Sequence, residues 1–598
     1  MRLDTLLIAL CSLPAVLGAT TAAQPSVQLD QGFVRGKRDI VDGVKLDKFL
    51  GVPFAQAPVG NLRFARPKAL AADKHVVIEA TQSGPACLQT GNATMSEGTR
   101  PSVPPAIPLL TCADCLSLDI VRPAGVPWGV RLPVVQWIYG GAFQTGSTAM
   151  YNLDAFVAAS VKLGHPVIAV NANYRLGGFG FMGGEDFVDA VQQDPEATTL
   201  NAGTWDQRFA LQWTQANLAK FGGDVHKVLL LGQSAGAISI GLHLQANGGR
   251  DEGLFSAALM LSGTAGGTAM SPSHPRVTAT YANVTAAVGC PTSGAISLSC
   301  LRSVDAAKLS AAINVIQGSF AVAPLSGALA WGPGIDGFFM PDRGTVTINA
   351  GRIIDVPIAA GTCQDEGPTL VAPSALSNSA SFEAWFTSLA VVQNTTARET
   401  VLQRLFELYP DVPALGSPYS NAPVGVNGSI SQASATPDSR LFPPLATSNF
   451  KRGASIFGDF TFNGARRFFL STLARSSTHK SPIWAYVFRQ SNPGLAAYLG
   501  TPHGAECVTL LRLVLCGADP ALTEDMQRLA VGFAHFHDPR ALLRGASREW
   551  PTYLQGSAGE QGTLKQWKGD NVTLVADDFR KEQLAYFYEK DTAGVLAF

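Results

Sequence analysis

The stretch KVLLLGQSAGAISIGLHLQ, residues 227–245, constrains this chain more than any other segment. Ser234 stands between Gly232 and Gly236, directly after the apolar run 228–231 and before a helix-like pattern. In a G-x-S-x-G turn from strand to helix, the serine adopts a strained backbone conformation and the glycines avoid collisions with neighbouring chain. The turn lifts the hydroxyl above the sheet, where the first amides of the helix can donate to a developing anion. The segment therefore predicts a nucleophile elbow.

The G-x-S-x-G pattern alone is not specific, because 60 of the 598 residues are glycine and a simple Gly-rich turn is the alternative. The segments around it therefore decide between the two interpretations. Short apolar runs alternate with amphipathic stretches along the chain, which predicts an α/β fold with a largely parallel sheet. The predicted buried strands are 133–138, 166–170, 228–231, 257–261, 356–360 and 483–488, and helical patterns include 207–220 and 525–537. Such a sheet binds ligands at the carboxyl ends of its strands, so the residues that follow these runs are the candidates for chemistry.

The N-terminal residues predict a secretory signal peptide. MRLDTLLIALCSLPAVLGATTAAQ contains one early arginine, an apolar run from Leu6 to Leu17 and small residues around Gly18, and the run is too short for a membrane span. We expect residues 1–18 to be the signal peptide, with cleavage between 18 and 23, and residues 24–598 to form a single catalytic domain without a membrane anchor.

Cysteines, sequons and charge agree with this expectation. Loss of Cys11 with the signal leaves eight cysteines, an even number that suits disulfides in an oxidising compartment. Five N-x-S/T sequons predict N-glycosylation, at Asn92, Asn283, Asn394, Asn427 and Asn571. The net charge is −1 with Lys and Arg scattered along the chain, which argues against nucleic acid or an anionic membrane surface as partner.

Several blocks together resemble the type-B carboxylesterase/lipase family, which includes cholinesterases, fungal lipases and sterol esterases. FLGVPFAQAPVGNLRF (49–64) and DCLSLDIVRP (114–123) resemble the two N-terminal signatures of the family, and residues 201–237 are similar to its nucleophile block over the full length. GDFTFNGARRFF (458–469) and VADDFRKEQLAYFYE (575–589) look like the fungal lipases in particular. The resemblance covers nearly the whole chain after the signal peptide and implies an α/β-hydrolase fold, with a large, mostly parallel sheet flanked by helices.

The resemblance also implies a Ser, Glu, His triad in this chain order. Ser234 matches the nucleophile, Glu366 in VPIAAGTCQDEG matches the acid, and His503 in TPHGAE matches the base. In such a triad His503 would take the proton of Ser234 and return it to the leaving alcohol. Glu366 would fix the tautomer of the ring and stabilise the imidazolium.

Other residues compete for the acid and base roles. Asp365 stands beside Glu366 in the same turn and is the rival acid. The other histidines after this turn are His479, His535 and His537. The last two lie in a helix-like run two residues apart, so they would point in different directions and make poor metal ligands. The mechanism needs no cofactor, and no cluster with ligand spacing indicates a metal site.

The family's oxyanion hole matches Gly141, Ala142 and Ala235. The first two lie in a second Gly-rich turn, VVQWIYGGAFQTGS (134–147), where small residues let backbone amides approach a substrate. The chain departs from the family pattern at Ala142, which replaces a third glycine, and at Gln233, which replaces the usual glutamate before the nucleophile. We hypothesise that the Ala142 methyl narrows the site and that bulky tertiary-alcohol esters are turned over poorly.

The family disulfides match Cys87 with Cys115 and Cys290 with Cys300. Cys507 and Cys516 could close a further short loop, whereas Cys112 and Cys363 have no assigned partner. The loop 87–115 corresponds to the flap, or lid, that gates the site. Its stretch RPSVPPAIPLL (100–110) is rich in proline, which argues against a long amphipathic lid helix, so we expect weak interfacial activation.

These observations predict a secreted serine carboxylic-ester hydrolase that works through an acyl-enzyme. Two substrate classes stay open. The fungal resemblance favours a lipase or sterol esterase with a long acyl tunnel, and the short, proline-rich flap favours a carboxylesterase for short or aromatic-acid esters. A peptidase on the same fold and a non-catalytic cholinesterase-like binding protein are the alternatives. The sequence leaves the oligomeric state and the physiological substrate open.

Overall fold

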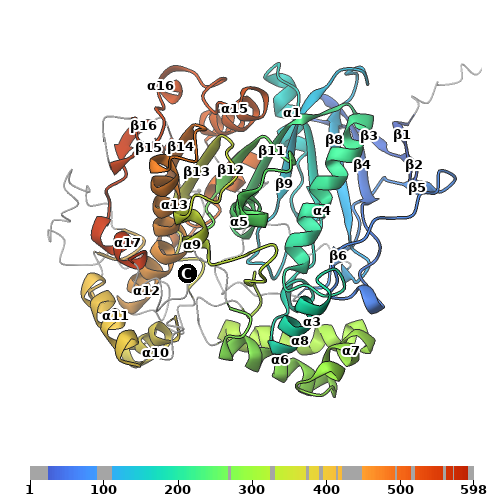
Figure 1. Ribbon diagram of the computed structural model, residues 1–598. Helices are drawn as coiled ribbons and strands as arrows, with labels where there is room; N and C mark the ends of the chain where they lie inside the picture. The colour runs from blue at the N-terminus through green and yellow to red at the C-terminus, as the bar shows by residue number, and fades with distance from the viewer. Residues whose placement is uncertain are drawn as a thin grey trace, which may run out of the picture.

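A computed structural model describes residues 24–89, 111–266, 271–322, 330–371, 376, 378–389, 395–412, 415–419, 448–491, 495–512, 519–555, 561–569 and 571–589 (Figure 1). Its centre is an 11-stranded sheet in the order β16-β15-β14-β13-β12-β11-β9-β10-β8-β4-β3. The strand bounds are β3 Lys37–Val41, β4 Val44–Pro53, β8 Ser117–Pro123, β9 Leu132–Ile138, β10 Ile168–Ala172, β11 Gly223–Gln233, β12 Ala257–Leu261, β13 Ile358–Cys363, β14 Ile483–Phe488, β15 Thr563–Trp567 and β16 Thr573–Ala576.

The strands from β10 through β9 and β11 to β15 run parallel to one another. The outer strands β8, β4 and β3 on one side and β16 on the other pair antiparallel. Strands β9, β10, β12, β13 and β14 are buried on both faces, as expected for parallel strands covered by helices. The six apolar runs of the sequence are all confirmed as strands, β9 to β14.

Smaller pairings lie outside this sheet. A three-stranded sheet joins β1 (Ser26–Leu29), β2 (Gly32–Arg35) and β5 (Val77–Glu79). A short parallel pair joins β6 (Ala86–Cys87) and β7 (Thr111–Cys112) at the base of the flap. The proline-rich stretch of the flap lies outside the described residues.

Helices cover both faces of the main sheet (Figure 1). One set, α1, α14 and α15, packs together, and α5 follows β11 directly and packs on β11, β12 and β9. The helix bounds are α1 Asp154–Lys162, α2 Gly177–Phe181, α3 Glu185–Gln193, α4 Ala202–Asn217, α5 Ala235–Gly249, α6 Pro275–Val288, α7 Ala295–Ser303, α8 Ala306–Val322, α9 Gly344–Asn349, α10 Ser379–Leu389, α11 Thr395–Leu408, α12 Ser448–Gly458, α13 Gly464–Arg475, α14 Ala505–Leu511, α15 Pro520–Phe536, α16 Gly545–Arg548 and α17 Lys581–Phe587. No helix among these is long and apolar enough to cross a membrane, within the part of the chain described above.

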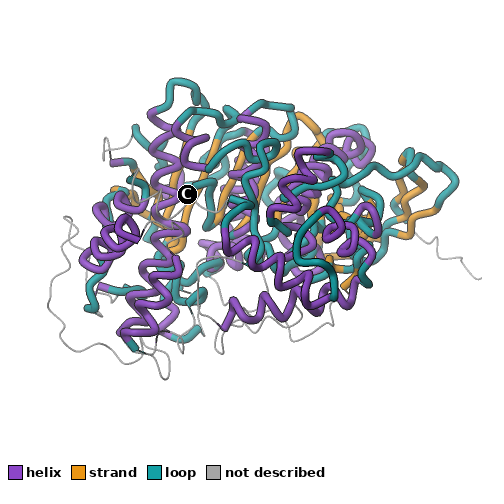
Figure 2. The backbone as a smooth tube through the Cα atoms, turned by 60° about the horizontal axis from the view of Figure 1, so that its bottom comes forward, coloured by secondary structure: helices purple, strands orange, loops and turns teal. Residues whose placement is uncertain are grey.

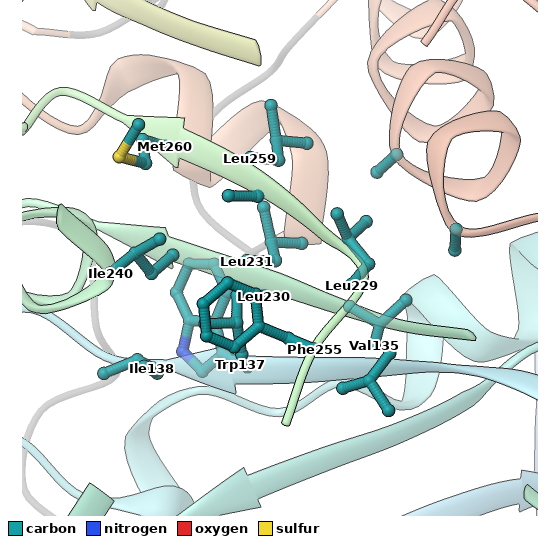
Figure 3. Close-up of a cluster of buried hydrophobic side chains, with 14 of the residues drawn as sticks. Val135, Trp137, Ile138, Leu229, Leu230, Leu231, Ile240, Phe255, Leu259 and Met260 are labelled. Carbon is teal, nitrogen blue, oxygen red and sulfur yellow. The ribbon is translucent and has the colours of Figure 1, made fainter. Parts of the chain in front are cut away.

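The main core lies where the sheet meets these helices. Trp137 of β9 and Leu259 of β12 point to one face of the sheet and Leu230 of β11 points to the other, and all three are buried. Phe255, just before β12, and Ile240 on α5 are buried in the same core (Figure 3). Each such side chain contributes about 1.5 to 3 kcal/mol when fully buried. The parallel pairing of β11 with β9 and β12 sets the register of these strands and therefore fixes the positions of the residues that follow them.

Two further helical groups lie at the end of the sheet where the parallel strands terminate. Helices α6, α7 and α8 form one group with its own buried cluster, and α10, α11 and α12 form another (Figures 1 and 2). The first cluster includes Phe143 and Ala235, and the second includes Phe460. The first group therefore reaches the turns that follow β9 and β11. The second lies against the turn that follows β13, where a Cβ on Gly458 of α12 would lie 3.3 Å from the Cβ of Glu366.

Candidate active site

Ser234 lies at the junction of β11 and α5 in a strained conformation with positive φ, at φ 58° and ψ −127°. The two glycines of the motif explain how the chain tolerates this turn. A Cβ on Gly236 would lie 2.0 Å from the carbonyl oxygen of Ile138, and a Cβ on Gly232 would lie 2.8 Å from the backbone of Gly236. Because no side chain fits at either position, the turn needs both glycines, and it leaves the serine half-buried at the end of the sheet.

The second Gly-rich turn follows β9 and lies against the nucleophile. A Cβ on Gly140 would lie 2.8 Å from the Cβ of Ser234. Gly141, Ala142 and Phe143 all have positive φ, at 101°, 56° and 60°, and the Gly141 carbonyl accepts the amides of Gln144 and Thr145.

The amides that the sequence assigns to an oxyanion hole are free to donate. Among the described residues, no hydrogen bond uses the N–H groups of Gly141, Ala142 or Ala235. Ala235 is the first residue of α5, whose N-terminus carries a partial positive charge. The arrangement offers donors for a negative oxygen beside Ser234.

His503 and Glu366 come together from two other strand ends. Glu366 follows β13, and His503 lies between β14 and α14. His503 Nδ1 is 2.5 Å from Glu366 Oε2; the side chain of Glu366 is fully buried and that of His503 is 9% exposed. The other carboxylate oxygen of Glu366 accepts the Cys363 amide at 2.6 Å and the Ser262 hydroxyl at 2.7 Å. Glu366 is thus held on one side while it orients the ring of His503 on the other.

Asp365, the rival acid, serves the neighbouring loop instead. Its carboxylate accepts the amide of Thr501 at 3.0 Å and the hydroxyl of Ser417 at 2.9 Å. The other candidate histidines lie elsewhere: His479 lies near Asp355, His535 Nε2 lies 3.2 Å from the Pro166 carbonyl, and His537 Nε2 lies 3.0 Å from Ser256 Oγ. Of the rivals, none contacts His503 or Ser234 within the described part of the chain.

A second buried carboxylate, Glu506 on α14, extends this network. Its oxygens bind the Ser262 hydroxyl and the Cys363 thiol. Burial, together with repulsion from Glu366, raises the pKa of Glu506 from 4.5 to about 7. Counting hydrogens leads to the same result: Ser262 has one hydroxyl hydrogen but lies between two carboxyl groups, so one of the two must carry a proton for both contacts to be hydrogen bonds.

The thiol of Cys363 and the carboxyl groups of Glu366 and Glu506 bring their ligand atoms within 4.8 Å of one another. These atoms already bind one another, Ser262 and His503, so the group works as a hydrogen-bond network. Burial and the two carboxyl groups also raise the pKa of the Cys363 thiol, which keeps it protonated and able to donate.

The second ring nitrogen of His503 faces Gln233 rather than the serine. Gln233 Nε2 is 3.1 Å from His503 Nε2, while no hydrogen bond joins Ser234 to His503 in the described structure. The ring of Phe462 lies 4.5 Å from the imidazole, centre to centre, and covers one of its faces. Neither the Gln233 contact nor Glu506 was predicted from the sequence, although Glu506 stands three residues after His503 in the same motif.

Two disulfides are confirmed, Cys87–Cys115 and Cys290–Cys300. The suggested pair of Cys507 and Cys516 is wrong: Cys507 carries a free thiol, and Cys516 lies outside the described residues. The physical reason is that Cys507 points from α14 into the main core, where it is 3% exposed and packs among apolar side chains. Cys112 and Cys363 are also free thiols.

Two of the five sequons can be located. Asn283 on α6 and Asn571 before β16 are both exposed. Asn92, Asn394 and Asn427 lie outside the described residues. Glycosylation at all five sites stays a prediction.

Comparison with known proteins identifies the class. The model of the Carboxylesterase family matches residues 23–586. Lipase 2 of Geotrichum candidum is 32% identical over 92% of this chain and 93% of its own length. A secreted triacylglycerol lipase, LIP1 of Gibberella zeae, is 31% identical over 96% of this chain and 91% of its own. The chain belongs to the carboxylesterase family and is a carboxylic ester hydrolase.

The fold is also known from a solved structure. EstA of Aspergillus niger superposes with a TM-score of 0.76, covering 96% of this chain and 99% of its own, at 24% sequence identity. The predicted α/β-hydrolase fold is confirmed. A relative described as an inactive carboxylesterase-like protein, VdtD of Byssochlamys spectabilis, is 29% identical over 78% of this chain and 74% of its own length.

Proposed function

We propose that this chain is a secreted serine esterase that hydrolyses carboxylic esters through an acyl-enzyme on Ser234, with His503 as base and Glu366 as the acid that orients it. The observation that carries the proposal is the meeting of four strand ends: the elbow after β11, the turn with free amides after β9, and the His503–Glu366 pair at 2.5 Å, in which Glu366 follows β13 and His503 follows β14. An α/β sheet binds its ligands at this edge.

The chemistry follows from these positions. Ser234 Oγ attacks the ester carbonyl carbon and passes its proton to His503 Nε2, while the carbonyl oxygen becomes an anion bound by the amides of Gly141, Ala142 and Ala235. His503 then gives this proton to the alkoxide oxygen, and the alcohol leaves. A water molecule then hydrolyses the acyl-enzyme. His503 takes one proton from the water, and the water oxygen attacks the acyl carbon. The carboxylic acid product is released as His503 returns the proton to Ser234 Oγ.

We propose esters of fatty acids as the preferred substrates, because relatives over more than nine-tenths of the chain bear the names of lipases. Short or aromatic-acid esters are the second candidate, favoured by the proline-rich flap stretch 100–110. Weak interfacial activation also stays a prediction, since this stretch lies outside the described residues.

Secretion is part of the proposal. It is supported by the signal-like N-terminus, by two disulfides, and by relatives that are themselves named as secreted. N-terminal sequencing of protein from the culture medium would test it: we expect a start between residues 19 and 24, and full-length protein retained in the cells would contradict it.

Hydrolysis of p-nitrophenyl esters from acetate to palmitate, by the wild type and by Ser234→Ala, tests the function. We expect activity that rises toward long chains and is lost in the variant. A maximum at acetate or butyrate would favour the second substrate class. Equal rates in wild type and variant would refute the assignment of Ser234, and an inert wild type would favour a binding role like that of an inactive relative.

A further inference from the structure

Gln233 is the last residue of β11 and lies between the nucleophile and the base. It is 6% exposed, and its amide is enclosed by two glycine positions. A Cβ on Gly140 would lie 3.0 Å from Gln233 Oε1, and a Cβ on Gly504 would lie 3.5 Å from Gln233 Nε2. The oxygen of the amide therefore faces the turn after β9, and its nitrogen faces the loop of His503. The side chain is held in place by its surroundings.

The direction of the contact between Gln233 and His503 follows from the other ring nitrogen. Nδ1 lies 2.5 Å from the Glu366 carboxylate, so the proton of the neutral ring belongs on Nδ1. Nε2 then has a lone pair and no proton, and can only accept. Gln233 Nε2, at 3.1 Å, is the donor.

We infer that Gln233 is a positioning residue for His503, which holds the imidazole from the Nε2 side and favours its neutral form over the imidazolium. This inference rests on the proposed function. An imidazolium would turn a second N–H toward the amide hydrogens of Gln233, a donor against a donor, whereas the neutral ring accepts from them. Gln233 releases Nε2 when Ser234 transfers its proton.

The charged groups around His503 stay constant when Gln233 is changed. Glu366 faces Nδ1, Glu506 on α14 lies behind Glu366 and interacts electrostatically with His503, and Phe462 covers a ring face without charge. The described structure places no cationic side chain in contact with the ring. Glu506, with a pKa of about 7, titrates in the wild type and in the variants alike, so the effect of a charge at position 233 is read as the difference between variant and wild type.

Gln233→Glu is the decisive variant, because it keeps the shape of the side chain and replaces the amide by a carboxylate. A carboxylate at this distance stabilises the imidazolium, so we expect the acid limb of kcat/KM for a p-nitrophenyl ester to move to higher pH by about 1 unit or more. Gln233→Met is the matched control, of similar length but without charge or donor. Because this variant loses one hydrogen bond, we expect its kcat to fall by about 3- to 10-fold and its KM to stay within about twofold of the wild type. Its acid limb should lie less than about 0.5 pH unit from that of the wild type, because only a weak neutral contact is lost.

A loss of folded enzyme that is the same at every pH lowers the whole profile and leaves the position of the limb unchanged, so such misfolding leaves the test intact. A limb in Gln233→Glu that coincides with the wild type overturns the inference. If that variant cannot be produced, Gln233→Met decides alone, and an unchanged kcat overturns the inference. Failure of the proposed function looks different: the wild type itself is inert, or Ser234→Ala is as active as the wild type.

Discussion

Glu506 makes the stability of this enzyme depend on pH. Its carboxyl group is completely buried between Ser262 and Cys363, and its pKa is raised from 4.5 to about 7 in the folded protein. The folded state therefore binds a proton between pH 4.5 and 7 that the unfolded chain has already released. The stabilisation is complete below pH 4.5 and is lost as the pH rises through 7.

The size of the effect follows from the two pKa values. A difference of about 2.5 pH units corresponds to about 3 kcal/mol at 1.36 kcal/mol per unit, most of which falls between pH 5 and 8. Glu506→Gln removes the titration but keeps the shape, and its amide can still donate to Ser262. We expect the variant to gain about 2 to 3 kcal/mol of unfolding free energy relative to the wild type between pH 5 and pH 8.

Urea unfolding followed by tryptophan fluorescence at pH 5, 6, 7 and 8 would measure this gain. Glu399→Gln is the control, because Glu399 is an exposed glutamate on α11. The free energy of unfolding of the control should differ from that of the wild type by the same amount at all four pH values. A gap between Glu506→Gln and the wild type that is the same at pH 5 and pH 8 would refute the reasoning, since it would mean that Glu506 does not titrate in this range.

Three further changes test the site and its support. Ala142→Gly should raise the rate on a tert-butyl ester by about tenfold or more relative to p-nitrophenyl acetate, because one methyl group leaves the oxyanion turn; efficient hydrolysis of the tert-butyl ester by the wild type would sink the idea. Gly236→Ala should destabilise the fold by about 3 kcal/mol or more and abolish esterase activity, because the new Cβ would lie 2.0 Å from the Ile138 carbonyl oxygen. Gly129→Ala is the control and should do neither, because no atom lies within 4 Å of its new Cβ. Removing the Cys87–Cys115 disulfide should lower the free energy of unfolding by about 3 to 4 kcal/mol, and removing Cys290–Cys300 by about 2 to 3 kcal/mol, because the first closes a span of 28 residues and the second a span of 10. A larger loss for Cys290–Cys300 than for Cys87–Cys115 in urea unfolding would contradict the loop-entropy argument.

The sequence predicted the parallel centre of the sheet because those strands are buried on both faces and form continuous apolar runs. The outer strands were missed. β3 alternates half-buried with exposed residues, and β4 carries charged residues such as Asp47 and Lys48, which are buried only because they pair with Arg122 and Asp154. Such pairing is not visible in a local pattern.

The site residues were predictable where a motif fixes a local turn, as at Ser234. The pairing of His503 with Glu366 rather than Asp365 came from family resemblance and not from spacing, since the two acids are adjacent. The tertiary contacts could not be predicted, because they join segments far apart in the chain. Ser262 follows a predicted strand, which marked it as a possible site residue, but its position between Glu366 and Glu506 depends on β12, β13 and α14 packing together. The Cys507 error has the same origin, because spacing does not show which way a side chain on α14 points.

The most direct test of the account is to trap the nucleophile. A p-nitrophenyl alkylphosphonate reacts with an activated serine, releases p-nitrophenol and leaves a stable phosphonate ester that peptide mass spectrometry can locate. We predict one adduct per molecule, on Ser234, with loss of esterase activity in proportion to labelling, and no adduct on Ser234→Ala. An adduct on another residue that accounts for the lost activity, or full ester hydrolysis by Ser234→Ala, would contradict the central claim.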